Sequence, residues 1–243
     1  MHYIGIDLGG TSIKGAVVTE GGTILKEASC PTQRELGPEH VAREIAGLIT
    51  ALAEGYDPQA IGGVGVGCPG IVEDHSGIVR YSANLHWENF DLRAAVQKYS
   101  GYTVRLANDA NAAALGECFT GRGRGCRNVV LITLGTGVGG GLVLDGKLYG
   151  GAREIAGELG HFTLYQDGPE CPCGKRGCFE HYASVTALIR RAHAAAPGTE
   201  WNGRRIFAHA AQGDAVMLRV LDEWIGDVAA GITGLVHIFN PEA

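Results

Sequence analysis

A short pattern that occurs twice constrains the fold of this chain more than any other feature of its sequence. Residues 4–11 form an apolar run that ends in a turn of glycine and threonine, and residues 129–137 repeat the same plan. A second apolar segment follows each turn, so each copy predicts a β-hairpin. Because glycine has no Cβ, the backbone N–H groups of such a turn can approach and hold phosphate oxygens. Two copies predict a clamp for a nucleoside triphosphate, although either copy alone is also compatible with an unrelated hairpin.

The segments around the two hairpins predict an α/β fold. The first copy begins a three-stranded meander, one helix has Pro38 in its first turn, and Asp91 caps another. The first half follows the plan βββαβαβα, with strands at residues 3–7, 13–18, 23–28, 61–66 and 103–107 and helices at residues 38–54, 91–99 and 110–119.

The pattern starts again at Asn128, which indicates a second lobe. We expect a small lobe at residues 1–120, with the first hairpin, and a large lobe at residues 121–243, with the second. A long core helix is predicted at residues 214–239 because apolar side chains recur there at helical spacing. These are Leu218, Leu221, Ile225, Val228, Ile232, Leu235 and Ile238.

Charge and hydrophobicity argue against two classes of partner. The net charge is −6 and the isoelectric point is near 5.8, so neither nucleic acid nor an anionic membrane would attract this chain. The basic stretch at residues 122–127 is interrupted by glycines, which favours a solvated loop over a phosphate-binding one. No apolar run approaches the ~20 residues that a membrane span needs, and the N-terminus lacks a signal-like stretch. We therefore expect a cytoplasmic protein with no nucleic-acid and no membrane partner.

Four residues near the middle of the second half predict a metal site. The chain has seven cysteines and no export signal, which makes a disulfide framework improbable on chemical grounds. His161, Cys171, Cys173 and Cys178 supply one imidazole and three thiolates, the ligand set of a closed structural zinc site. The alternative is a set of buried reduced thiols beside an unrelated histidine. Since four protein ligands leave no open position, we expect Zn²⁺ to shape the site and to do no chemistry.

The motifs together resemble the ROK family of repressors and sugar kinases, and within it they are most similar to bacterial glucokinases. The resemblance covers the whole chain. It implies an actin-like, RNase H-like ATPase fold with two lobes and an active site in the interlobe cleft. The motifs are DLGGTSIK (residues 7–14), CPG (residues 68–70), NDANAAALGE (residues 108–117), LGTGVGGG (residues 134–141) and the segment at residues 158–180.

The resemblance also implies a reaction. ATP with Mg²⁺ would phosphorylate the 6-hydroxyl of a hexose, glucose by overall resemblance, and Asp109 would be the catalytic base. For Asp109 alone, a helix N-cap is an equally good interpretation, because aspartate favours that position. The sugar-contacting residues implied by the resemblance are Asn84, Asn108, Asp109, Glu158, His161 and Glu180.

The nucleotide would be held by residues of both hairpins. Asp7 is the expected Mg²⁺ anchor, through water, although a strand-end aspartate that caps its own turn explains it as well. The phosphates would be held by Gly9, Gly10, Thr11, Lys14, Gly135, Thr136 and Gly137.

Several alternatives stay open at this stage. An N-acylhexosamine kinase, for N-acetylmannosamine or N-acetylglucosamine, would use nearly the same carboxylates. A sugar-sensing regulator of the same family would carry an N-terminal helix-turn-helix, for which a first strand at Tyr3 leaves no room. The second half lacks strands to match the first, so the resemblance implies that the adenosine-binding C-terminal part is missing. A non-catalytic sugar-binding remnant is therefore a third alternative. The family implies a homodimer or homotetramer, and another phosphoryl donor such as polyphosphate is compatible with the sequence.

Overall fold

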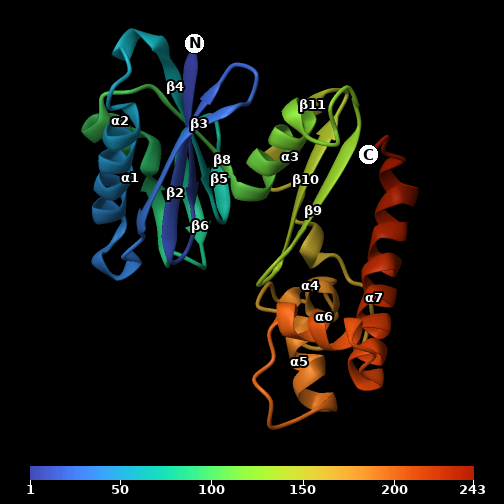
Figure 1. Cartoon of the computed structure of the whole chain (residues 1–243). Coiled ribbons are helices and arrows are strands. Elements are labelled where there is room, and N and C mark those ends of the chain that lie inside the picture. Colours follow the sequence, from blue (N-terminus) through green and yellow to red (C-terminus); the bar gives the residue numbers. More distant parts are fainter. The chain divides into compact units, whose positions relative to one another are not determined.

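The chain divides into two compact units, and each unit is made of two separate stretches of the sequence. The computed structural model describes residues 1–243, and the elements are labelled in Figure 1. Unit 1 consists of residues 1–126 and 147–156, and unit 2 consists of residues 127–146 and 157–243. Neither unit is therefore one continuous stretch of sequence. None of the helices has the length and apolar composition needed to cross a membrane.

Unit 1 is built on a five-stranded sheet in the order β3-β2-β1-β4-β8. The predicted meander is confirmed: β1 (His2–Leu8), β2 (Ser12–Thr19) and β3 (Ile24–Pro31) pair antiparallel. β4 (Ile61–Cys68) and β8 (Val104–Asn108) run parallel to β1. Because parallel strands end at the same edge, the register places Asp7 beside Gly67, and Cys68 beside Asn108.

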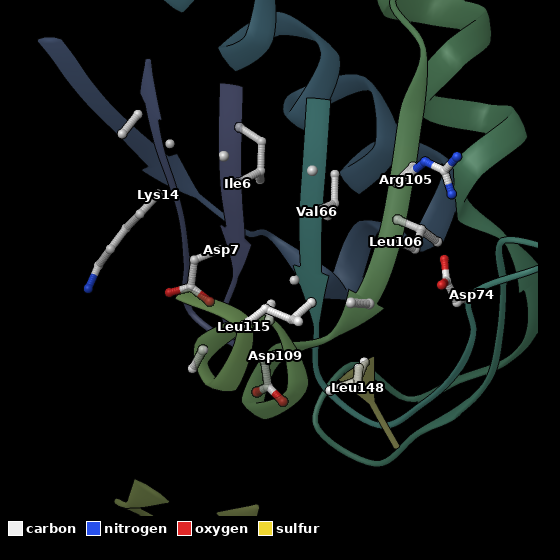
Figure 2. Close-up of a pocket in the computed structure, with 18 of the residues that line it drawn as sticks. Ile6, Asp7, Lys14, Val66, Asp74, Arg105, Leu106, Asp109, Leu115 and Leu148 are labelled. Atoms are coloured by element: carbon white, nitrogen blue, oxygen red, sulfur yellow. The ribbon is translucent and has the colours of Figure 1, made fainter. Parts of the chain in front are cut away.

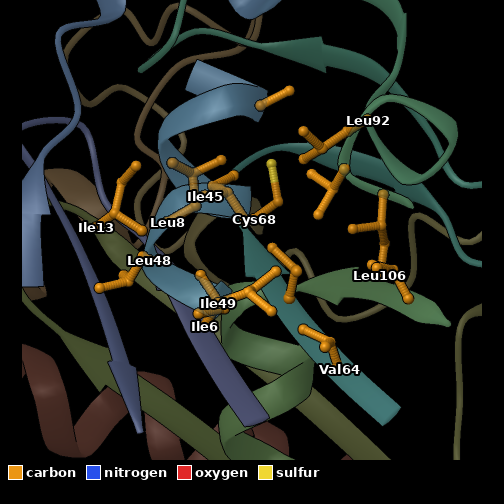
Figure 3. Packing of buried hydrophobic residues seen from close by; sticks show 14 of the residues in the cluster. Ile6, Leu8, Ile13, Ile45, Leu48, Ile49, Val64, Cys68, Leu92 and Leu106 are labelled. Atoms are coloured by element: carbon orange, nitrogen blue, oxygen red, sulfur yellow. The ribbon is translucent and has the colours of Figure 1, made fainter. Parts of the chain in front are cut away.

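The hydrophobic core of unit 1 lies between this sheet and two helices. Along β1, Ile4, Ile6 and Leu8 are buried and the intervening residues point to the other face, as the two-residue period of a strand requires. α1 (Pro38–Ala53) and α2 (Leu92–Ser100) contribute the facing apolar stripes (Figure 3). The predicted cap is confirmed, since the carboxylate of Asp91 accepts a hydrogen bond of 2.9 Å from Ala94 N.

A small antiparallel sheet between β4 and α2 is absent from the predicted plan. It consists of β5 (Ile71–Glu73), β6 (Ile78–Ser82) and β7 (Trp87–Asp91), in that order. These strands have three to five residues and carry charged side chains, so their hydrophobic period is too short to recognise. The helix α3 (Asp109–Thr120) follows β8 as predicted. Short 3-10 helices lie at Arg34–Leu36 and Pro58–Ala60.

The segment 147–156 completes unit 1 from a distant part of the sequence. It contains β11 (Lys147–Leu148) and a 3-10 helix at Gly151–Arg153. Glu154 joins it to the turn between β5 and β6, because its carboxylate accepts hydrogen bonds from Asp74 N at 2.6 Å and pairs with Nδ1 of His75 at 3.0 Å. The hydrogen bond with Glu154 raises the pKa of His75, so the contact is strongest when the imidazole is protonated.

Unit 2 contains the second hairpin and most of the remaining helices. β9 (Val129–Leu134) and β10 (Val138–Leu144) pair antiparallel, which confirms the predicted hairpin. The 3-10 helix η4 (Leu159–His161) packs closely on β10, since a Cβ on Gly140 would lie 2.7 Å from Cβ of Leu159. The other helices are α4 (Glu180–Ala183), α5 (Val185–Ala195), α6 (Gly203–Ala211) and α7 (Ala215–Phe239).

The long helix α7 has the predicted bounds, but only part of the predicted apolar stripe is buried. Of the predicted core stripe, Leu218, Ile225, Ile232 and Ile238 are exposed. The buried face also includes Gly231, which allows the ring of Phe179 to lie against the helix backbone: a Cβ there would be 2.6 Å from Cδ2 of Phe179 and would collide with Cε2. Leu221 and Leu235 of the predicted stripe are buried, so the prediction was right in part. Spacing alone does not select one face, because apolar residues surround most of α7.

Candidate active site

Two carboxylates lie where the parallel strands of unit 1 end. Asp7 closes β1 on the exposed side, and Asp109 is the first residue of α3, directly after β8. Figure 2 shows both side chains at this edge of the sheet. The carboxyl ends of parallel strands are where α/β folds place their ligands, so this edge is the first part of the candidate site.

The surroundings of Asp109 favour its protonated form more than water would. Burial raises the pKa of Asp109, and the negative charge of Asp7 raises it further. The hydrogen bond that Oδ1 accepts from Ala110 N, at 2.8 Å, acts in the opposite direction. A carboxylate with a raised pKa is a better proton acceptor near neutral pH, which suits a general base.

The N-cap of α3 is Asn108, so the interpretation of Asp109 as the cap was wrong. Oδ1 of Asn108 accepts a hydrogen bond of 3.1 Å from Asn111 N, and Nδ2 donates one of 3.0 Å to Gly70 O. The second bond ties the helix to the loop after β4. Asn108 thereby fixes the start of α3, and with it the position of Asp109.

A cavity of 740 Å³ covers the sheet face of unit 1 that points away from α1 and α2. Asp7, Lys14 and Asp109 line it, while Asn84 and Asn108 do not. Its floor is made largely of small residues: Gly5, Ala16, Gly65 and Ala107. Asp7 and Lys14 are paired across β1 and β2, so both side chains are on this face (Figure 2).

The first glycine turn is held by a residue that the sequence did not reveal. Gly9 N donates to Ser12 O at 3.0 Å, and a Cβ on Gly9 would lie 2.8 Å from that oxygen, which explains the glycine. Thr32, at the end of β3, is fully buried. Its N–H donates to Thr11 O at 3.1 Å and its hydroxyl to Gly9 O at 2.7 Å. The turn is therefore fixed from the neighbouring strand.

Asn84 lies in the loop between β6 and β7. The guanidinium of Arg34 donates a hydrogen bond to its carbonyl oxygen. A Cβ on Gly10 would lie 3.8 Å from both groups, so this loop is close to the first glycine turn.

The second glycine turn is held by residues that come more than forty positions later. Gly135 N donates to Gly137 O at 2.9 Å within the turn. Val185 N donates to Gly135 O at 2.9 Å, and the hydroxyl of Thr186 donates to Thr136 O at 2.7 Å. The start of α5 thus fixes this turn, a contact that no local pattern predicts.

The four predicted metal ligands converge. One ligand atom from each of His161, Cys171, Cys173 and Cys178 lies within 4.8 Å of the others. Nδ1 of His161 is 3.6 Å from Sγ of Cys171, and the sulfurs of Cys173 and Cys178 are 3.5 Å apart. The edge of a zinc–thiolate tetrahedron is about 3.8 Å, given Zn–S bonds of about 2.3 Å. The donor set and its spacing therefore fit Zn²⁺.

Two predicted sugar ligands, Glu158 and Glu180, flank this cluster, and a third, His161, belongs to it. Glu158 precedes η4, and His161 ends it, with His161 N donating to Glu158 O at 3.0 Å. Glu180 is the first residue of α4, two positions after Cys178, and its Oε2 accepts a hydrogen bond of 2.9 Å from Val138 N.

The predicted site residues are thus divided between the units. Unit 1 carries Asp7, Gly9, Gly10, Thr11, Lys14, Asn84, Asn108 and Asp109. Unit 2 carries the second turn, the metal cluster, Glu158 and Glu180. Within each unit the residues lie at one glycine turn and its surroundings. Thr32 and Thr186 are the residues that sequence reasoning missed, because each acts on a turn that is distant in the sequence.

Known proteins are similar to this chain in both sequence and fold. A sequence profile of the ROK family matches residues 3–243. A glucokinase from Thermotoga maritima is 40% identical over 256 aligned positions, which cover 100% of this chain and 80% of the relative. A xylose repressor from Caldicellulosiruptor bescii is 34% identical, and the alignment covers 98% of this chain and 63% of the repressor.

A solved structure of a ROK family protein has a similar fold. The ROK family glucokinase from Streptomyces griseus, in complex with glucose and AMPPNP, superposes with a TM-score of 0.87 at 35% identity. The match covers 99% of this chain and 81% of that one. The predicted actin-like α/β architecture is therefore confirmed.

Proposed function

Because the chain belongs to the ROK family, we propose that it is a hexose kinase, which transfers the γ-phosphoryl group of ATP to the 6-hydroxyl of glucose. The observation that carries the proposal is the position of Asp109. This carboxylate has a raised pKa and lies with Asp7 at the edge where three parallel strands end. The similarity to glucokinases over the whole chain supports glucose as the hexose.

In the proposed reaction, unit 1 supplies the base and part of the phosphate site. Asp109 accepts the proton of the 6-hydroxyl while that oxygen forms a bond to the γ-phosphorus, and the bond to the bridging oxygen of ADP breaks. Asp7 would hold Mg²⁺ through water, and the ion would supply charge neutralisation at the phosphates. Gly9, Gly10, Thr11 and Lys14 hold phosphate oxygens. Phosphoryl transfer needs mainly positioning and charge neutralisation, and these residues provide both.

Unit 2 supplies most of the sugar contacts in this proposal. Carboxylates and an imidazole accept and donate hydrogen bonds to a ring of hydroxyls in fixed directions. Glu158, His161 and Glu180 bind hydroxyl groups, and Asn84 and Asn108 of unit 1 add amide contacts. Nδ1 of His161 faces the metal cluster, so Nε2 is the atom that meets the hexose.

Zn²⁺ has a structural role in the proposal. His161, Cys171, Cys173 and Cys178 hold it and leave no coordination position for a substrate. With these four residues bound to one ion, the loop between Glu158 and Glu180 would be fixed and both carboxylates would be oriented.

The proposal is tested by a substrate panel. The purified chain is mixed with Mg-ATP and, in turn, with glucose, mannose, fructose, N-acetylglucosamine and N-acetylmannosamine, while ADP release is followed. Glucose calorimetry runs in parallel. We expect turnover to be fastest with glucose. Preference for an N-acetylated sugar would instead establish an N-acylhexosamine kinase, and sugar binding without any ADP release would establish a sugar-binding protein without kinase activity.

A further inference from the structure

The carboxylate of Glu180 touches the second glycine turn as well as the proposed sugar site. Its Oε2 accepts the hydrogen bond from Val138 N at 2.9 Å, in a half-buried position. Val138 is the first residue of β10, directly after the turn. A residue proposed to bind the hexose is therefore bonded to the backbone proposed to bind phosphate.

The glycine at position 137 is what permits this contact. A Cβ on Gly137 would lie 3.1 Å from Cδ of Glu180 and in direct collision with Oε2. The φ angle of Gly137 is not in the left-handed region, so the backbone does not require glycine there. The requirement is space for the carboxylate. By contrast, a Cβ on Gly135 meets nothing within 4 Å.

Glu180 is itself held in place by the loop that carries the metal ligands. Phe179 N donates to Phe162 O at 2.9 Å, and His181 N donates to Cys178 O at 3.0 Å. The same stretch of chain continues into Val185 and Thr186, which bind the turn at two further carbonyl groups. Within unit 2, sugar ligand, metal loop and turn thus form one hydrogen-bonded assembly.

We propose that Glu180 couples the two substrate sites, so that hexose and nucleotide bind with positive cooperativity. The inference rests on the proposed function. Oε2 is committed to Val138, which leaves Oε1 for a hexose hydroxyl. A bound hexose restricts the carboxylate and thereby fixes Val138 N and the turn beside it, so the nucleotide meets an ordered phosphate site. By linkage the nucleotide strengthens hexose binding by the same factor, and we expect about tenfold, within the usual range for coupled sites.

The test is calorimetry of glucose binding with and without saturating Mg-AMPPNP. In the unmodified chain we expect AMPPNP to strengthen glucose binding about tenfold. Gly137→Ala pushes Glu180 away from Val138 but leaves the carboxylate available to glucose. In this variant AMPPNP should therefore change glucose affinity less than about twofold. Glu180→Asp, which keeps the charge and is one methylene shorter, should lose the coupling in the same way. It serves as the second variant in case Gly137→Ala does not fold.

Thr186→Val is the matched control, because it removes another bond to the turn and leaves Glu180 in place. We expect it to keep at least half of the coupling factor. Loss of coupling in Thr186→Val to the same degree as in Gly137→Ala would overturn the role of Glu180. A chain that binds both ligands independently overturns this inference alone, whereas a chain that binds neither overturns the proposed function with it.

Discussion

The two glycine turns share one sequence plan, yet different parts of the chain hold them. Thr32, from the next strand, fixes the turn at Gly9 through two hydrogen bonds. Glu180, Val185 and Thr186, which follow the metal cluster, fix the turn at Gly135. The first turn therefore depends on its own sheet, and the second depends on the stretch that follows the proposed metal ligands. The two turns, although similar in sequence, should therefore be destabilised by changes in different parts of the chain.

The comparison extends to the chemistry beside each turn. The first turn follows Asp7, the proposed Mg²⁺ anchor, whose charge raises the pKa of the proposed base Asp109, and the second turn is bonded to the proposed sugar ligand Glu180. Changes in unit 1 should therefore act mainly on kcat, and changes in unit 2 mainly on sugar binding. The predictions below, in decreasing order of effect, test this division.

The largest effect is expected from Asp109→Asn. The amide cannot accept the hydroxyl proton, so kcat should fall about 10²- to 10⁴-fold, while glucose affinity changes little because the side chain keeps its size and an oxygen acceptor. Steady-state kinetics and glucose calorimetry measure the two effects. Normal turnover, or loss of glucose binding, would contradict the assignment of Asp109 as the base.

Metal removal should affect the second glycine turn and leave the first unchanged. Chelation, or Cys178→Ser, frees the loop that carries Glu158 and Glu180, so glucose affinity should fall at least about tenfold, as for other changes that disorient ligands around a metal. Hydrogen exchange should rise at residues 134–138 and stay unchanged at residues 8–12. Cys118→Ser, at a cysteine outside the cluster, is the control. Equal increases at both turns would remove the distinction between them.

A matched pair of threonine substitutions compares the supports directly. Thr32→Val removes a hydroxyl bond to Gly9 O from a fully buried side chain, so the free energy of unfolding should fall by about 1–3 kcal/mol. Thr186→Val removes an equivalent bond to Thr136 O from an exposed side chain, where water replaces the donor, and the loss should be about 0.5 kcal/mol. Denaturant unfolding measures both. A larger loss for Thr186→Val would reverse the expected order.

The smallest expected effect is a shift in pH dependence, which is measured separately from the loss of activity caused by changing the proposed Mg²⁺ anchor. The Asp7 carboxylate helps to raise the pKa of Asp109, so Asp7→Asn should lower that pKa and shift the acidic limb of kcat/KM to lower pH. The base form of Asp109 then persists in more acidic solution. Glu27→Gln, at another carboxylate that lines the cavity, should leave the limb in place. A shift to higher pH in Asp7→Asn would show that the two charges do not interact as inferred.

The sequence predicted those features that short-range patterns determine. The alternation in β1, the cap at Asp91 and the cluster of one histidine and three cysteines each appear within a few residues or as a distinctive set. The strands β5 to β7 were missed because they are too short to show a period, and the buried face of α7 was only partly predicted because Gly231 against Phe179 decides it. The ties from Thr32 and Glu180 to the turns depend on tertiary contacts, which spacing in the sequence does not reveal.

The interleaving of the two units along the sequence has a consequence for biosynthesis. Residues 147–156, anchored by Glu154 to Asp74 and His75, belong to unit 1 although unit 2 begins at residue 127. During translation, unit 1 stays incomplete until residue 156 has left the ribosome, by which time the second hairpin has already emerged. A gene truncated between the two hairpins would therefore encode an unfinished first unit, and no single uninterrupted stretch of this sequence encodes either unit alone.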